Sequence, residues 1–138
     1  MHLDNNEKKK YLNRYRDSGR KIINLHEELK ALREIKQSAK VQQLSDMPKG
    51  SIRQQDLSDV LVGIEKLQKR IDDEIVRQIK IRLEIENQLL CVSDAQEARV
   101  LRLRYIELMK WEEICVQMNY SWKGIHKVHG RALKNLNI

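Results

Sequence analysis

Two long segments of the chain place apolar residues at alternating spacings of three and four, and this pattern constrains the fold most. The first segment, residues 11–44, contains no proline, and Gly19 is its one residue of low helix propensity. The spacing predicts one long helix with a heptad seam, which Ile23 and Ile35 would broaden. The seam consists of Tyr11, Tyr15, Ser18, Ile22, Leu25, Leu29, Leu32, Lys36 and Ala39.

A second long helix is predicted from Gln54 onward. Pro48 and Gly50 predict a turn near residues 46–50 between the two helices. After Ile75 the apolar stripe is expected to drift, as a straight helix of about 3.6 residues per turn does against a repeat of about 3.5. The stripe consists of Leu57, Val60, Leu61, Ile64, Leu67, Ile71, Ile75, Gln78, Ile79, Ile81 and Ile85.

Two amphipathic helices of similar length joined by a short turn favour an antiparallel hairpin within one chain. The alternative is an intermolecular coiled coil, which would make the protein a homodimer. We therefore predict an all-α fold in which residues 1–92 form a long, coiled-coil-like helical hairpin. Residues 1–10 are polar and are expected to fray. Lys8, Lys9 and Lys10 are interpreted as solvated residues, with a phosphate contact as the alternative.

Residues 93–138 predict a small helical domain that ends in a helix-turn-helix. Ser93 and Gln96 match a capping box, which is expected to start the first helix of this domain. Glu97 and Arg104 are expected on the polar side of that helix. Its expected inward positions are Ala98, Leu101, Tyr105 and Leu108.

Residues 111–136 have the spacing of the helix-turn-helix itself. Apolar residues recur at positions 114, 118, 120, 125 and 128, and Cys115 is small where the two helices must approach. Asn119 tolerates the left-handed backbone that a tight helix end requires, and Ser121 is a good N-cap for the second helix. The alternative is an ordinary two-helix corner with a solvated basic face.

The outer face of the second helix is basic. Residues 121–138 contain four Lys or Arg, two His and no Asp or Glu. Positions 122, 123, 126 and 127 lie opposite Ile125 and Val128, on the face that a recognition helix presents to the DNA major groove. The formal net charge is +7, and the excess cations lie in residues 1–50 and 93–138, which favours a polyanionic partner.

Other classes of function find no support in the residues. No nucleophile–base pair and no Gly-rich phosphate loop can be identified, so we expect no enzymatic activity, no cofactor and no metal site. Asp72, Asp73 and Glu74 are consecutive, so their side chains point to different sides of a helix. No signal peptide or membrane-spanning run is found, so we expect a cytoplasmic protein with no membrane partner. Cys91 and Cys115 are then expected to be free thiols.

Residues 96–136 resemble region 4 of bacterial sigma factors, which recognises the upstream promoter element. Three blocks carry the resemblance: residues 97–105 (EARVLRLRY), residues 111–115 (WEEIC) and residues 131–136 (RALKNL), together with Ser121. A helical hairpin ahead of such a domain is similar to small phage-encoded transcriptional regulators of the RinA and ArpU type. The chain departs from the sigma pattern at Asn119, where the turn usually has Gly, and at Gly124 and Gly130 within the second helix.

The resemblance implies a sequence-specific, DNA-binding regulator of phage or prophage transcription in a bacterial host cell. Double-stranded DNA is the expected partner, and the hairpin is expected to contact RNA polymerase or a second protomer. The alternative is a protein-interaction adaptor that binds RNA polymerase through the sigma-like domain without contacting DNA. The implied base-reading residues are Trp122, Lys123, His126 and Lys127. The implied backbone contacts are Arg104, Ser121 and Arg131, with Lys110 and Lys134 added by their charge.

Two of these assignments have an alternative that the sequence leaves open. Arg104 could form a surface ion pair, and Trp122 could make a hydrophobic contact with a neighbouring domain. Each histidine of this segment is equally compatible with a neutral surface group and with a hydrogen-bond donor to DNA.

Overall fold

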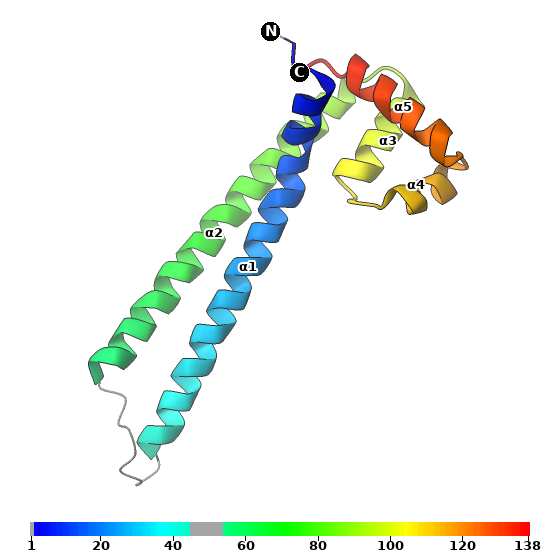
Figure 1. Cartoon of the computed structure of the whole chain (residues 1–138). Coiled ribbons are helices and arrows are strands. Elements are labelled where there is room, and N and C mark those ends of the chain that lie inside the picture. Colours follow the sequence, from blue (N-terminus) through cyan, green and yellow to red (C-terminus); the bar gives the residue numbers. More distant parts are fainter. Residues whose placement is uncertain (1, 45–53) are drawn as a thin grey trace. The chain divides into compact units, whose positions relative to one another are not determined.

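The computed structural model describes residues 2–44 and 54–138, and all regular secondary structure in these ranges is α-helical (Figure 1). The helices are α1 (Asn5–Leu44), α2 (Gln54–Leu90), α3 (Ala95–Tyr105), α4 (Trp111–Met118) and α5 (Trp122–Asn135). The predicted all-α fold, with a long hairpin followed by a helix-turn-helix, is therefore confirmed. The predicted turn near residues 46–50 lies outside the described residues.

The chain divides into two compact units, each of which contains part of both long helices. The smaller unit is Arg20–Val76, and the larger unit combines Met1–Gly19 with Arg77–Ile138. In each unit α1 and α2 run antiparallel, so the hairpin forms within one chain (Figure 1). The predicted domain boundary between residues 92 and 93 implies that residues 93–138 can fold on their own, and this stays a prediction.

The smaller unit is held together by one apolar seam between α1 and α2. Leu25 and Leu29 of α1 pack with Leu67 and Ile71 of α2. A Cβ atom added at Gly63 would lie 3.2 Å from a terminal carbon of the Leu32 side chain. Glycine at this position therefore allows the two helices to approach closely.

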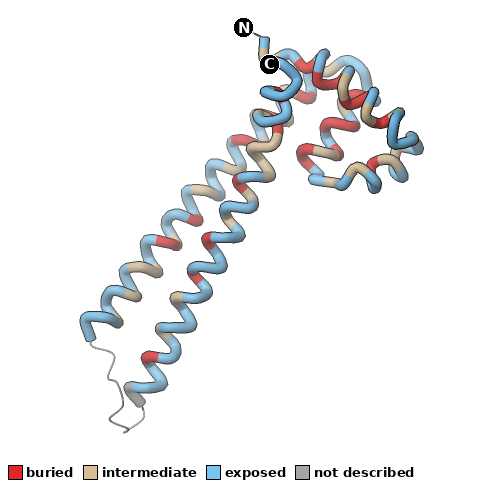
Figure 2. The backbone as a smooth tube through the Cα atoms, viewed as in Figure 1, coloured by how far each residue is buried: buried red, intermediate tan, exposed pale blue. Residues whose placement is uncertain are grey.

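The predicted seam of α1 is confirmed at every position, because each member between residues 11 and 39 is buried or half-buried (Figure 2). Ile23 and Ile35, which were expected to broaden it, are instead 58% and 47% exposed. A pair of helices buries little beyond the a and d positions of the heptad, which explains why these two isoleucines remain outside.

The predicted seam of α2 is wrong at three positions. Leu61, Ile75 and Ile79 are exposed. Gln78 is half-buried as predicted, and so is Glu74, which was not predicted. The seam keeps its spacing of three and four through positions 71, 74, 78, 81 and 85. The expected drift after Ile75 therefore does not occur, since the heptad register, and not hydrophobicity at single positions, decides which residues face α1.

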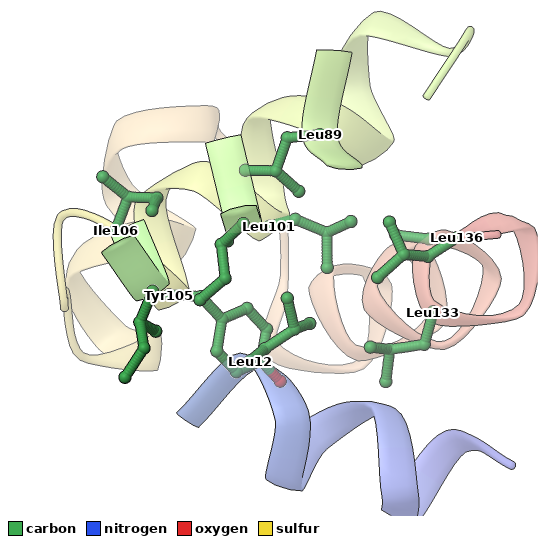
Figure 3. Packing of buried hydrophobic residues seen from close by; sticks show 10 residues of the cluster. Leu12, Leu89, Leu101, Tyr105, Ile106, Leu133 and Leu136 are labelled. Carbon is green, nitrogen blue, oxygen red and sulfur yellow. The ribbon is translucent and has the colours of Figure 1, made fainter. Parts of the chain in front are cut away.

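The larger unit encloses a hydrophobic core that α1, α2, α3 and α5 share (Figure 3). In Figure 3 the side chains of Leu12, Leu101, Tyr105 and Leu133 point toward one another. The ends of the long helices thus complete the core on which α3 and α5 rest. Its buried members are Leu12, Ile81, Ile85, Leu89, Leu101, Tyr105, Ile106, Ala132, Leu133 and Leu136.

Three predictions around α3 are wrong. Leu108, expected to point inward, is 45% exposed and has a left-handed backbone with φ of 56°. Glu97, expected on the polar side, is buried, and its carboxylate accepts a hydrogen bond of 3.1 Å from Asn135 Nδ2. The N-cap is Asp94 and not Ser93, because the Asp94 side chain accepts the backbone amide hydrogen of Glu97.

The first residues of the chain are held in place, contrary to the expectation of a frayed end. The backbone amide of Glu7 donates to Asp4 Oδ1 at 2.8 Å, and that of Asp4 donates to Glu7 Oε2 at 2.9 Å, which forms a capping box. Lys8, expected to be solvated, is buried, and its Nζ donates to the carbonyls of Leu133 and Leu136, each at 2.7 Å. The ammonium thus adds a charged donor to carbonyls at the negative end of the α5 dipole, where a cation is favoured.

Replacement of Lys8 by methionine is expected to lower the free energy of unfolding by about 1–3 kcal/mol. Methionine keeps an apolar stem but leaves the carbonyls at the end of α5 without their charged donor. Urea denaturation followed by tryptophan fluorescence measures the change. Lys10→Met removes the same charge from an exposed position of the same helix and is the matched control. Equal stability of the two variants would contradict the capping role of Lys8.

Candidate nucleic-acid interface

The turn between α4 and α5 has the predicted geometry. α4 ends at Met118, and its C-cap Asn119 has the left-handed angles φ 57° and ψ 47°. The hydroxyl of Ser121 accepts a hydrogen bond of 3.0 Å from the backbone amide of Gly124 and so caps α5. The predictions of Asn119 as the break and of Ser121 as the N-cap are both confirmed.

A second core holds α5 by its apolar face against α3 and α4. Met118 and Tyr120 pack against this core, as does the half-buried Cys115. All the apolar positions predicted for the helix-turn-helix thus contribute to the core, and the opposite face of α5 is turned outward. The buried members are Val100, Leu103, Ile114, Ile125 and Val128.

The outward face of α5 gathers most of the predicted DNA-contacting residues. An open hollow of about 600 Å³ follows this face, and Lys127, Arg131 and Lys134 are among its lining residues. Gly130 also lines it, and a Cβ atom added there would meet nothing within 4 Å. The helix surface is therefore both cationic and open. The exposed residues of the face are Trp122, Lys123, Lys127, Arg131 and Lys134.

His126 differs from its neighbours on α5, because it belongs to a row of rings that we call the aromatic chain. Ring centroids are separated by 4.6 Å between Trp122 and His126, and by 4.7 Å between His126 and Trp111. Trp111 is in turn 4.6 Å from His129, which is 5.8 Å from Tyr105. His126 is half-buried and contacts both indoles, so its ring supports Trp122.

The inner end of the aromatic chain is a buried pair. The Tyr105 hydroxyl and His129 Nε2 share a hydrogen bond of 2.8 Å. Burial, together with the smaller effect of the nearby charges of Lys9, His126 and Arg104, lowers the pKa of His129 to about 4. Burial raises the pKa of Tyr105 to about 12. Both groups are therefore neutral at neutral pH, and His129 is neither a surface group nor a DNA donor.

The remaining predicted contacts, Arg104 and Lys110, come from α3 and from the N-cap position of α4. Arg104 Nη1 donates to the carbonyl of Met109 at 3.0 Å, and the guanidinium lies 4.9 Å from the centroid of the Trp111 ring. Arg104 thus stabilises the connection between α3 and α4 and one face of the aromatic chain. Lys110 is exposed.

The aromatic chain was not predicted from the sequence, although a signal for it is present there. Trp122, His126 and His129 are spaced by four and three, which places all three on one side of a helix. The same spacing is common in core-facing stripes. The contact with Trp111 requires knowledge of how α4 crosses α5, which the spacing does not contain.

In the part of the chain that the structure describes, no helix is long and apolar enough to cross a membrane. Among the same residues, no group of three or more His, Cys, Asp or Glu could hold a metal ion. Cys91 and Cys115 are both free.

A family model described as "Protein of unknown function (DUF1492)" matches residues 37–137, which is well over half of the chain. The chain belongs to the DUF1492 family. Comparison with curated proteins and with solved structures gave no match. The part of the chain that matches the DUF1492 model contains α2, α3, α4 and α5, and hence the complete helix-turn-helix with its cationic face. Lys8 and Leu12 precede the matched region.

Proposed function

We propose that this DUF1492 protein is a sequence-specific DNA-binding regulator of phage or prophage transcription, which acts in the cytoplasm of the bacterial host. The observation that carries the proposal is the acid-free outer face of α5, which a helix-turn-helix turns toward solvent. The major groove of B-DNA admits an α-helix, and the second helix of this motif is the one that enters it.

The residues of this face have distinct roles in the proposed complex. Lys127 was expected to read bases, but it lines the open hollow together with Arg131 and Lys134, so we assign all three to phosphates. The free backbone amides at the N-terminus of α5 favour a further phosphate. Lys123 lies in the first turn, where side chains reach base edges, and a lysine donates best to the O6 and N7 acceptors of guanine. The phosphate contacts set the register, whereas the base contacts give specificity.

The proposal is tested by enriching random duplexes on the full-length protein and titrating the enriched duplex by fluorescence anisotropy. Lys127, Arg131 and Lys134, with the exposed Lys110, give about four phosphate contacts. The logarithm of the affinity should therefore fall with the logarithm of the salt concentration with a slope of about −4. Failure of the wild-type protein to bind any duplex, even near 50 mM salt, would reject the proposal.

Lys134→Ala and Lys123→Ala are expected to change DNA binding in different ways. Lys134→Ala should weaken binding to all sequences alike and should make the salt slope shallower by about one. Lys123→Ala should weaken binding about tenfold and relax the preference at one base position. Both effects are measured by anisotropy against the enriched duplex and its single-position variants. Lys80→Ala, an exposed lysine of α2, is the control and should bind as the wild type does.

A second candidate function is the polymerase-binding adaptor, and one observation favours it. A hollow of about 450 Å³ on α4 is lined by Met109, Glu112, Glu113, Val116 and Gln117. Val116 is 83% exposed, so this surface combines an apolar centre with acidic neighbours and suits a basic, apolar protein segment. In this case Val116→Asp should abolish binding to purified RNA polymerase. Lys123→Ala and Lys134→Ala should leave that binding unchanged.

A further inference from the structure

Trp122 is an unusual residue for the position it occupies. It is the first residue of α5, directly after the cap Ser121, and it is 55% exposed. Lys123 and Lys127 are exposed beside it on the acid-free face. A large apolar ring in such a place remains hydrated in the free protein, so it can gain free energy by burial only in a complex.

The indole is nevertheless held in a defined position. The ring of His126 meets it in an edge-to-face arrangement with an interplanar angle of 68°. His126 is itself packed against Trp111, which also contacts the guanidinium of Arg104 and the ring of His129. The aromatic chain therefore supports Trp122 from the inside of the domain. A ring positioned in this way loses little side-chain entropy when it binds a partner.

The charges around Trp122 restrict what that partner is. The lysines beside the ring favour a polyanion and disfavour a cationic protein segment. Within the major groove of a duplex, the faces of the bases are stacked, and the apolar group that a side chain can reach is the C5 methyl of thymine. The thymine methyl is therefore the group in this groove that an apolar ring on a cationic helix can contact.

We propose that Trp122 is a specificity-determining residue that recognises thymine through its C5 methyl group. The inference rests on the proposed DNA-binding function and adds to it the identity of one base. The preferred thymine lies within one or two base pairs of the base that Lys123 contacts, because the two residues are adjacent in the first turn of α5.

The test replaces each thymine of the enriched duplex in turn by deoxyuridine, which removes only the methyl group. For the wild-type protein, one or two of these replacements should weaken binding about three- to tenfold, as expected for loss of one buried methyl. For Trp122→Ala the same replacements should have no effect, which closes a double-mutant cycle between the ring and the methyl. Trp122→Leu, which keeps an apolar side chain, should retain part of the discrimination.

Lys123→Ala is the matched control, because it should weaken binding yet keep the full sensitivity to deoxyuridine. Duplex binding in which no deoxyuridine replacement depends on Trp122 would overturn the inference and leave the DNA-binding proposal standing. Trp122-dependent binding that is tighter for a duplex with an unpaired base would also overturn it, in favour of ring stacking. If the wild-type protein binds no duplex at all, both proposals fail. Circular dichroism of each variant confirms that the helices are intact.

Discussion

Replacement of Leu12 by alanine is expected to lower the free energy of unfolding by about 2–5 kcal/mol. Leu12 is fully buried in the shared core of the larger unit, and its neighbours in that core come from α2, α3 and α5. Truncation would therefore leave a cavity where several helices meet and where no single helix can move to fill it. The residue belongs to α1, far from the helix-turn-helix in the sequence, yet its loss should destabilise the candidate interface.

Trp111 and Trp122 both lie in the larger unit, so tryptophan fluorescence during urea denaturation reports on this unit directly. The matched control is Leu83→Ala on α2, since Leu83 is 54% exposed and should change stability by less than about 0.5 kcal/mol. Equal midpoints for the Leu12 and Leu83 variants would show that α1 does not contribute to the core of the helix-turn-helix domain.

The long hairpin could be predicted from the sequence because the heptad spacing is itself the physical cause of the pairing. The seam of α1 follows from that spacing at every position, including the polar Ser18 and Lys36. On α2 the predicted stripe correctly included Gln78, but it also included Ile75 and Ile79 and left out Glu74. A strict count of three and four from Ile71 selects Glu74 and Gln78 alone, so the error came from choosing Ile75 and Ile79 for their hydrophobicity.

Long-range polar contacts could not be predicted. Lys8, Lys9 and Lys10 are chemically identical in the sequence, and only the packing of α1 against α5 makes Lys8 the buried one. Glu97 is a similar case, because its partner Asn135 lies on another helix. Local polar signals were within reach: Asp4 and Glu7 have the spacing of a capping box, and this pair was overlooked.

The turn and the exposed face of the candidate interface could be predicted from the sequence, but the side-chain packing that supports this face could not. The break at Asn119, the cap at Ser121 and the inward positions of α5 depend on local rules, and the structure confirms them. The roles of His126 and His129 depend on how α4 packs against α5. The two histidines look alike in the sequence but differ in the structure. His126 supports the ring of Trp122, whereas His129 is a buried, neutral partner of Tyr105.

Acidification from pH 6.5 to 4 is expected to destabilise the larger unit by about 3 kcal/mol through His129 alone. Burial lowers the pKa of His129 in the folded protein from 6.5 to about 4. Below pH 6.5 the unfolded chain therefore binds a proton that the folded protein does not bind, and the equilibrium shifts toward unfolding. The penalty is small above about pH 6.5, grows as the pH falls and levels off below about pH 4.

Carboxyl groups titrate in part of the same range, so the measurement is the difference between the wild type and His129→Gln. Urea denaturation at a series of pH values should give a stability that falls more steeply with acid in the wild type than in the variant. Glutamine can still pair with the Tyr105 hydroxyl but carries no titrating proton. His26→Gln removes an exposed histidine of α1 and should keep the steep dependence of the wild type. If the stability difference between the wild type and His129→Gln stays constant from pH 7 to 4, His129 is not the buried neutral group described above, and the aromatic chain must end in a solvated ring.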